Sequence, residues 1–153
     1  MSKFSDQVNR RVNPKIDALM RGLLLDLTER VVDGTPVDTG RARANWNVSI
    51  NRPDTKTFSV KDTRTQEQKE AKQLVPKYVA KARRNEQRNS SRAERWNAHK
   101  GGPAYLANGL PYISRLEQGY STQRPQGWVR IAINDLRPQV RKTAAKIRRL
   151  QRI

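Results

Sequence analysis

Residues 35–50, TPVDTGRARANWNVSI, contain both a turn and the start of a strand. Pro36 and Gly40 bracket the turn, and the side chain of Asp38 between them can cap backbone amides. Apolar and polar residues then alternate, with one side formed by Ala44, Trp46, Val48 and Ile50 and the other by Arg43, Asn45, Asn47 and Ser49. An alternation of period two predicts a half-buried β-strand whose polar side faces solvent.

The residues before this turn predict a long amphipathic helix. Apolar side chains recur at spacings of three and four, namely Phe4, Val8, Val12, Ile16, Leu19, Leu23, Leu27 and Val31. Pro14 follows Asn13, so either a short helix precedes Pro14 or the long helix kinks there. Asp33, Gly34 and Pro36 predict the end of the helix.

The residues after the first strand predict a small sheet and a second long helix. A turn at residues 51–54 precedes Phe58 and Val60, which predict a second strand. Residues 111–117 predict one or two helical turns that place Ile113 and Leu116 inward. The alternation of Val129, Ile131 and Ile133 predicts a third strand, and a closing helix is predicted by the stripe Leu136, Val140, Ala144, Ile147 and Leu150. The expected fold is α+β: a long N-terminal helix, a small antiparallel sheet and a C-terminal helix, with a basic extended or helical insertion.

The charge is large and unevenly distributed. The 153 residues include 32 basic and 14 acidic ones, a net charge of +18. Residues 61–102 carry twelve basic and five acidic residues, and residues 103–153 carry ten and two. Between residues 62 and 100 the only Leu, Ile, Val or Met residues are Leu74, Val75 and Val79. We therefore expect one domain, 1–153, in which residues 62–102 form a basic arm that orders on contact with a partner.

Several function classes are disfavoured by residue content. The chain has no cysteine, which excludes disulfides, thiolate zinc sites and cysteine nucleophiles and fits a reducing or non-secreted setting. No aliphatic run is long enough to span a membrane, and the first residues are polar. The only histidine, His99, has no carboxylate near it in the sequence and reads as a solvated loop residue. We expect no catalytic residue, no metal and no cofactor, although a carboxylate-only nuclease site stays formally open.

Two basic stretches predict contact with a polyanion. In residues 77–95 the cations mostly follow helical spacing, and we expect DNA or an acidic partner to bind Lys77, Lys81, Arg83, Arg84, Arg88, Arg92 and Arg95. The closing helix is also rich in cations, more than the helix dipole requires. We expect DNA or an acidic partner to bind Arg141, Lys142, Lys146, Arg148 and Arg149 as well. No base-reading motif is present, so sequence-nonspecific contact with the phosphate backbone is the better expectation.

Two segments resemble a known family. Residues 35–50 are similar to a motif of bacteriophage head–tail joining and tail-completion proteins, the neck family that includes minor-tail-protein-Z-like members. Residues 108–133, NGLPYISRLEQGYSTQRPQGWVRIAI, resemble the second motif of that family, although Tyr120 stands where threonine is usual. The matching positions are Thr35, Pro36, Asp38, Thr39, Gly40, Trp46, Tyr112, Leu116, Glu117, Gly119 and Ser121.

The resemblance implies a virion structural protein and not an enzyme. Such a protein closes into a homo-oligomeric ring, commonly a hexamer, at the neck between the DNA-filled head and the tail. Its expected partners are portal-side connector proteins, tail-side proteins and the double-stranded DNA in the lumen, and no membrane. It would be assembled in the host cytoplasm and located in the virion. The alternative is a free, sequence-nonspecific DNA-binding packaging accessory, which explains the charge equally well but not the two motifs.

Overall fold

The structure is a computed structural model that describes residue 6 and residues 8–152. The fold is α+β. Its elements, in chain order, are η1 (Val8–Val12), α2 (Asn13–Gly34), η2 (Arg43–Asn45), β1 (Asn47–Ile50), α3 (Gln66–Glu70), α4 (Pro76–Glu94), η3 (Ala98–Lys100), β2 (Ala104–Ala107), α5 (Ile113–Glu117) and α6 (Trp128–Gln151).

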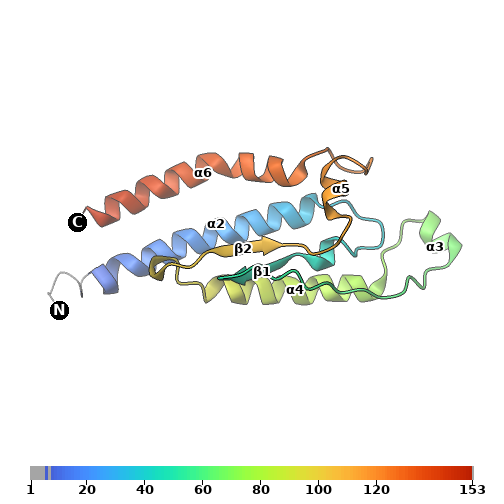
Figure 1. The fold of residues 1–153 in the computed structure, drawn as a ribbon, viewed down its shortest axis with the longest axis horizontal. Helices are drawn as coiled ribbons and strands as arrows, with labels where there is room; N and C mark the ends of the chain where they lie inside the picture. Colours follow the sequence, from blue (N-terminus) through green and yellow to red (C-terminus); the bar gives the residue numbers. More distant parts are fainter. Residues whose placement is uncertain (1–5, 7, 153) are drawn as a thin grey trace.

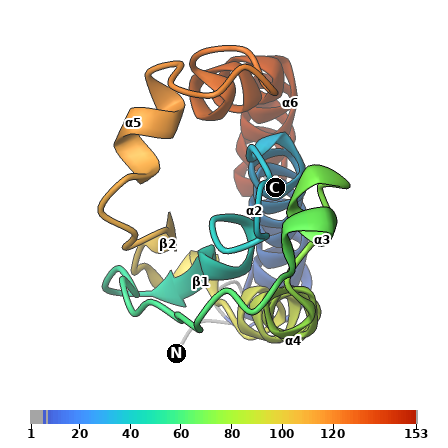
Figure 2. The same cartoon turned by 90° about the vertical axis from the view of Figure 1, so that its right-hand side faces the viewer.

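The three long helices lie nearly parallel to the long axis of the molecule (Figure 1). Helix α6 runs back along α2 in the opposite direction, and α4 lies on the other side of α2. Viewed along the helices, α6 is above α2 and α4 is below it, while β1 and β2 lie to one side (Figure 2). Helix α2 is therefore the central element, in contact with both α4 and α6.

The long N-terminal helix is confirmed as α2. Helix α2 begins at Asn13 and has Pro14 in its first turn. The short π-helical turn η1 precedes it, so of the two arrangements predicted at Pro14 the structure has a short helix before the long one. It ends at Gly34, as predicted, and Thr35 is extended. Ile16 and Val31 of the predicted stripe are buried, and so is Leu24, which the predicted stripe did not include. Phe4 and the side chain of Val8 lie outside the described residues.

The first strand is confirmed, but its predicted partner is wrong. Strand β1 pairs antiparallel with β2, with Val48 opposite Leu106. Phe58 and Val60 belong to no strand, and side chains bond their backbone groups instead. The Asn45 side-chain amide bonds the N–H and C=O of Phe58, at 2.6 and 3.0 Å, and the Tyr78 hydroxyl bonds those of Val60, at 3.0 and 3.1 Å. These side chains occupy the place that a neighbouring strand would take.

The outer edge of β1 is covered by side chains of α4. The Val48 amide donates to Asn89 Oδ1 at 2.9 Å, and Asn89 Nδ2 donates to the Trp46 carbonyl at 3.0 Å. Asn85 Nδ2 reaches the Ala44 carbonyl at 2.8 Å, and Arg92 Nη1 reaches the Val48 carbonyl at 2.7 Å. Because unpaired backbone groups are costly to bury, these contacts let a polar helix pack on the strand.

Two expectations about polarity are therefore wrong. Asn45 and Asn47 do not face solvent, because 1% and 2% of their surface is exposed. Residues 62–102 do not lack packing of their own: they include α3, α4 and η3, and Val75, Tyr78 and Trp96 are buried. The segment has few aliphatic side chains and packs through asparagines, aromatic rings and the smaller Val75 and Ala93.

The predicted third strand is also wrong, because residues 128–151 form α6. Its buried face is formed by Trp128, Ala132 and Leu136, one turn apart, while Ile131 and Ile133 are 42% and 46% exposed. The alternation of Val129, Ile131 and Ile133 therefore lies on a helix that carries apolar side chains on two faces, and it does not indicate a strand. The start of α6 packs closely on the end of α2: a Cβ at Gly34 would lie 2.8 Å from the ring of Trp128.

We predict that Asn89→Ala lowers the free energy of unfolding by about 1–3 kcal/mol, because it leaves the buried Val48 amide without its acceptor and leaves the Trp46 carbonyl only the longer bond from Asn85, at 3.5 Å. Urea unfolding measures the change. The matched control is Gln87→Ala, an exposed position of the same helix, for which we expect a change within about 0.5 kcal/mol. Equal unfolding free energies for the two variants would contradict the role of Asn89.

Candidate functional site

The two motif segments meet in one cluster between α2, β1 and α6. Trp46 Nε1 donates to Thr35 Oγ1 at 2.9 Å, and Thr35 Oγ1 donates to the Val31 carbonyl at 2.7 Å. The same carbonyl accepts a bond from Trp128 Nε1 at 3.2 Å. Leu116 packs against the buried cluster that contains Val31 and the two tryptophans. The cluster thus joins the end of the long helix to the start of the strand and the start of the last helix.

Glu117 caps the N-terminus of α6. Its carboxylate accepts hydrogen bonds from the backbone amides of Val129, at 3.1 Å, and Arg130, at 3.2 Å, and its carbonyl accepts one from Gly127 at 2.8 Å. A carboxylate at this end also stabilises the helix dipole. The helical turns predicted within residues 111–117 are confirmed as α5, which ends at Glu117, and Gly119 follows it with a φ of +95°.

The remaining motif residues shape the turn between α2 and β1. Pro36 and Gly40 are buried. The predicted cap is made by Thr39 instead of Asp38: the Arg41 amide donates to Thr39 Oγ1 at 3.1 Å. Asp38 Oδ1 lies 3.4 Å from the Arg64 guanidinium, which reaches back from the segment before α3.

Tyr112 and Ser121 also have local roles. The Arg41 guanidinium lies 5.7 Å from the centre of the Tyr112 ring, and burial raises the pKa of the Tyr112 hydroxyl. Ser121 Oγ accepts a hydrogen bond from the Gln123 amide at 3.3 Å. Together with Thr39 and Glu117, these contacts assign structural roles to the motif residues.

The α4 cations do not form one free surface. Arg92 also pairs with Asp54 at 3.0 Å, and Arg88 Nη2 donates to the side chains of Asn47 and Asn85 at 2.8 and 2.9 Å. Lys81 Nζ lies 5.4 Å from the centre of the Phe58 ring, and partial burial together with neighbouring arginines lowers its pKa. The exposed cations on this helix are Lys77, Arg83, Arg84 and the partly engaged Arg88. Arg95 directly follows the helix, is also exposed and donates to the Ser91 carbonyl at 3.2 Å.

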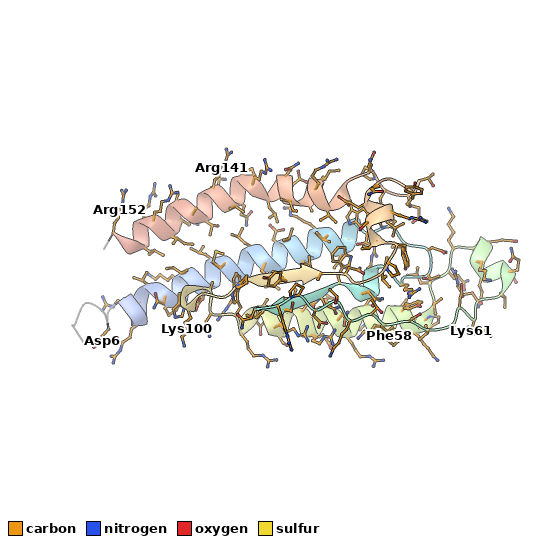
Figure 3. All side chains as sticks on the ribbon, in the orientation of Figure 1. Asp6, Phe58, Lys61, Lys100, Arg141 and Arg152 are labelled. Carbon is orange, nitrogen blue, oxygen red and sulfur yellow. The ribbon has the colours of Figure 1, made fainter. Side chains whose placement is uncertain are left out.

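The α6 cations all project into solvent. Arg141, Lys142, Lys146, Arg148 and Arg149 are exposed, and no ion pair among the described residues includes any of them. Figure 3 shows Arg141 and Arg152 pointing away from α2. Because α2 separates α6 from α4, the two predicted basic patches lie on opposite sides of the molecule (Figure 2). They form two surfaces and not a single one.

The expectation of a solvated His99 is wrong. His99 Nδ1 lies 2.8 Å from Asp17 Oδ2, and the His99 amide donates to Asp17 Oδ1 at 3.0 Å. Asp17 lies on α2 and is 4% exposed. Burial raises the pKa of its carboxyl, but the hydrogen bonds from His99 and the charge of Arg21 outweigh burial and lower it overall. A separation of 82 residues hid this pair from any local reading of the sequence.

Comparisons with protein-family models, curated proteins and solved structures found no significant match to this chain. Over residue 6 and residues 8–152, no group of three or more His, Cys, Asp or Glu side chains is placed to hold a metal ion. None of the helices in that part of the chain combines the length and apolar character needed to cross a membrane.

Glu117→Ala should lower the free energy of unfolding by about 0.5–2 kcal/mol, because two amides at the start of α6 lose their acceptor. Thermal and urea unfolding measure the loss, with the neighbouring exposed residue changed in Gln118→Ala as the control. If the two variants were equally stable, Glu117 would not act as a cap.

The Asp17–His99 contact predicts a pH dependence. Since the pKa of Asp17 is lower in the folded chain than its unfolded value of about 3.9, the unfolded chain binds the proton more readily in acid. The contribution is present above about pH 4 and is lost as the pH falls through the folded pKa.

Urea titrations between pH 7 and pH 3 test this expectation. Asp17→Asn should flatten the acid loss of stability, whereas Glu29→Gln, an exposed change on the same helix, should preserve it. Superimposable pH profiles for the wild type and Asp17→Asn would contradict the stabilising role of the pair.

Proposed function

We propose that this chain is a structural subunit of the neck of a tailed bacteriophage, closing into a ring around the DNA channel and joining the head to the tail. The observation that carries the proposal is the cluster of Thr35, Trp46, Leu116 and Trp128, with Glu117 capping α6 beside it. Two segments that resemble successive motifs of one family contribute to the same junction. The turn after α2 and the turn before α6 meet here because these two helices pack antiparallel.

The charge distribution supports a DNA channel as the setting of this ring. The predicted cations of α6 are exposed and take part in no ion pair among the described residues, which suits sequence-nonspecific contact with phosphates. Arg88 and Arg92 are weaker candidates for DNA contact because they bond to Asn47, Val48 and Asp54. The proposed DNA surface is therefore chiefly α6.

A ring requires two different complementary faces on each subunit, since heterologous contacts close under rotation. We propose a homo-oligomer, by the resemblance a hexamer, placed in the virion between portal-side and tail-side proteins. Its role is structural and not catalytic. The competing proposal, a free packaging accessory, requires the α6 cations but no closed assembly.

Light scattering after size exclusion in about 1 M salt, with negative-stain images of the same peak, tests the proposal. High salt removes bound nucleic acid, which would otherwise mimic assembly. We expect a closed ring with a central hole, formed either by the chain alone or on addition of a portal assembly. A species that stays monomeric under both conditions would contradict the ring.

A matched pair of variants tests the DNA surface. Changing Lys142, Lys146, Arg148 and Arg149 to glutamine, all exposed cations of α6 outside the groove described below, should reduce the salt dependence of duplex DNA binding, with a slope smaller by up to about 0.9 for each lost contact. Changing Lys61, Lys69, Lys72 and Lys100 to glutamine removes the same charge elsewhere and should have a smaller effect. If the wild-type protein forms no ring but binds DNA tightly through α6, that result would favour the free packaging accessory.

A further inference from the structure

A groove between α2 and α6 is lined almost entirely by apolar side chains. Its volume is about 460 Å³. Helix α2 contributes Met20, Leu23, Leu24 and Leu27; helix α6 contributes Ile133, Leu136 and Val140; and Trp96 and Ala104 also line it. Ile133 and Val140 are 46% and 47% exposed, so a considerable apolar area on this face faces solvent.

The spacing of these residues matches the surface of a helix. The lining residues cover seven steps along α2, from Met20 to Leu27, and seven along α6, from Ile133 to Val140. At 1.5 Å per residue, each row is about 10 Å long, or two helical turns. Two such rows on neighbouring antiparallel helices accept the apolar stripe of a third helix, with anchors at i, i+3 or i+4, and i+7.

The charged residues that line the groove are both cations. Arg137 and Arg141 lie one turn apart on α6, and the groove is lined by no carboxylate. The acids of the α2–α6 pair lie elsewhere: Asp26 pairs with Arg30 at 2.7 Å, and Asp135 raises the pKa of that same arginine. A partner helix therefore gains by carrying acids, about one turn apart, beside its apolar stripe.

A second copy of this chain is a poor occupant. The chain carries a net charge of +18, and the exposed surface of α6 is basic. Pressing another basic helix against Arg137 and Arg141 would bring like charges together. The charge of the groove thus favours a different protein.

We propose that this groove is a docking site for an acidic amphipathic helix of a partner protein. The partner would insert two turns of aliphatic side chains between α2 and α6 and place carboxylates against Arg137 and Arg141. Docking of a helix in this groove does not require a closed ring, so peptide binding and ring closure are tested independently.

The test uses a fluorescein-labelled synthetic peptide of about 15 residues, with leucines at i, i+3, i+4 and i+7 and glutamates flanking them. Fluorescence anisotropy in about 150 mM salt measures its affinity for the full-length protein. Ile133→Ser combined with Val140→Ser should weaken binding about tenfold, because each removes half-exposed apolar area from the groove. Ile131→Ser, similarly exposed on α6 but outside the groove, is the matched control and should bind as the wild type does.

A second pair of variants separates local charge from net charge. Arg137→Glu combined with Arg141→Glu should weaken binding at least tenfold. Lys61→Glu combined with Lys72→Glu changes the net charge equally at two exposed positions near α3 and should change affinity less than threefold. The apolar side chains changed here are at least 40% exposed, and the charged ones lie on the surface. We therefore expect each variant to keep the wild-type unfolding temperature, which is checked by thermal unfolding.

Three results would overturn the proposal. The wild-type protein could fail to bind the peptide, or the two charge-reversal pairs could weaken binding equally, which would indicate attraction by net charge alone. Sedimentation could instead reveal a wild-type dimer that Ile133→Ser and Val140→Ser dissociate and that the peptide does not displace, which would assign the groove to a second copy. The expected pattern is binding that is sensitive to both groove pairs and insensitive to both controls.

Discussion

The outer edge of β1 carries backbone groups that must find partners, and side chains of α4 supply them. Asn85, Asn89 and Arg92 recur at spacings of four and three, so they lie on one side of the helix and follow the strand. A sheet of two strands is marginal by itself. The helix closes one of its edges, protects it from pairing with other chains and fixes the position of α4 in the fold.

Other features depend on this contact. With α4 held against β1, Tyr78 can bond the backbone at Val60, and Trp96 can reach the Gly102 carbonyl at 3.1 Å and pack with Leu24. The loop after α4 then places His99 on Asp17 of α2. A segment that is rich in charge and poor in aliphatic residues is thereby connected to both the sheet and the central helix.

Local patterns predicted the elements whose signals are local. The stripe of α2, the alternation around Trp46 and Val48, and the short helix at Ile113 and Leu116 were all readable from the sequence. The partner of β1 was not, because β2 lies more than fifty residues away and AYLA has no alternation of polar and apolar residues. A helical insertion was among the expectations for this segment, but the packing of α4 on β1 was not predictable, because the buried asparagines that hold α4 look like surface residues in a sequence.

The candidate site was also only partly predictable from the sequence. The motif residues were found, but most of their roles required the structure: Glu117 is a cap for a helix that begins eleven residues later, and Thr35 links two tryptophans. The basic residues were found by counting charge. Which of them are structural, as on α4, and which are exposed, as on α6, depends on which side chains face β1. Leu23, Leu27, Leu136 and Val140 of the groove belong to the two predicted stripes, but the groove itself could not be predicted, because it combines α2 and α6 with Trp96 and Ala104.

Hydrogen–deuterium exchange of the free protein in dilute salt tests the central claim most directly. If side chains of α4 cover the edge of β1, the Val48 amide and the amides in the middle of α4 exchange as slowly as those in the middle of α2, because all of them open only when the fold opens. Exchange of residues 76–94 within seconds, while α2 stays protected, would contradict the account and return this segment to a basic arm that orders only on a partner.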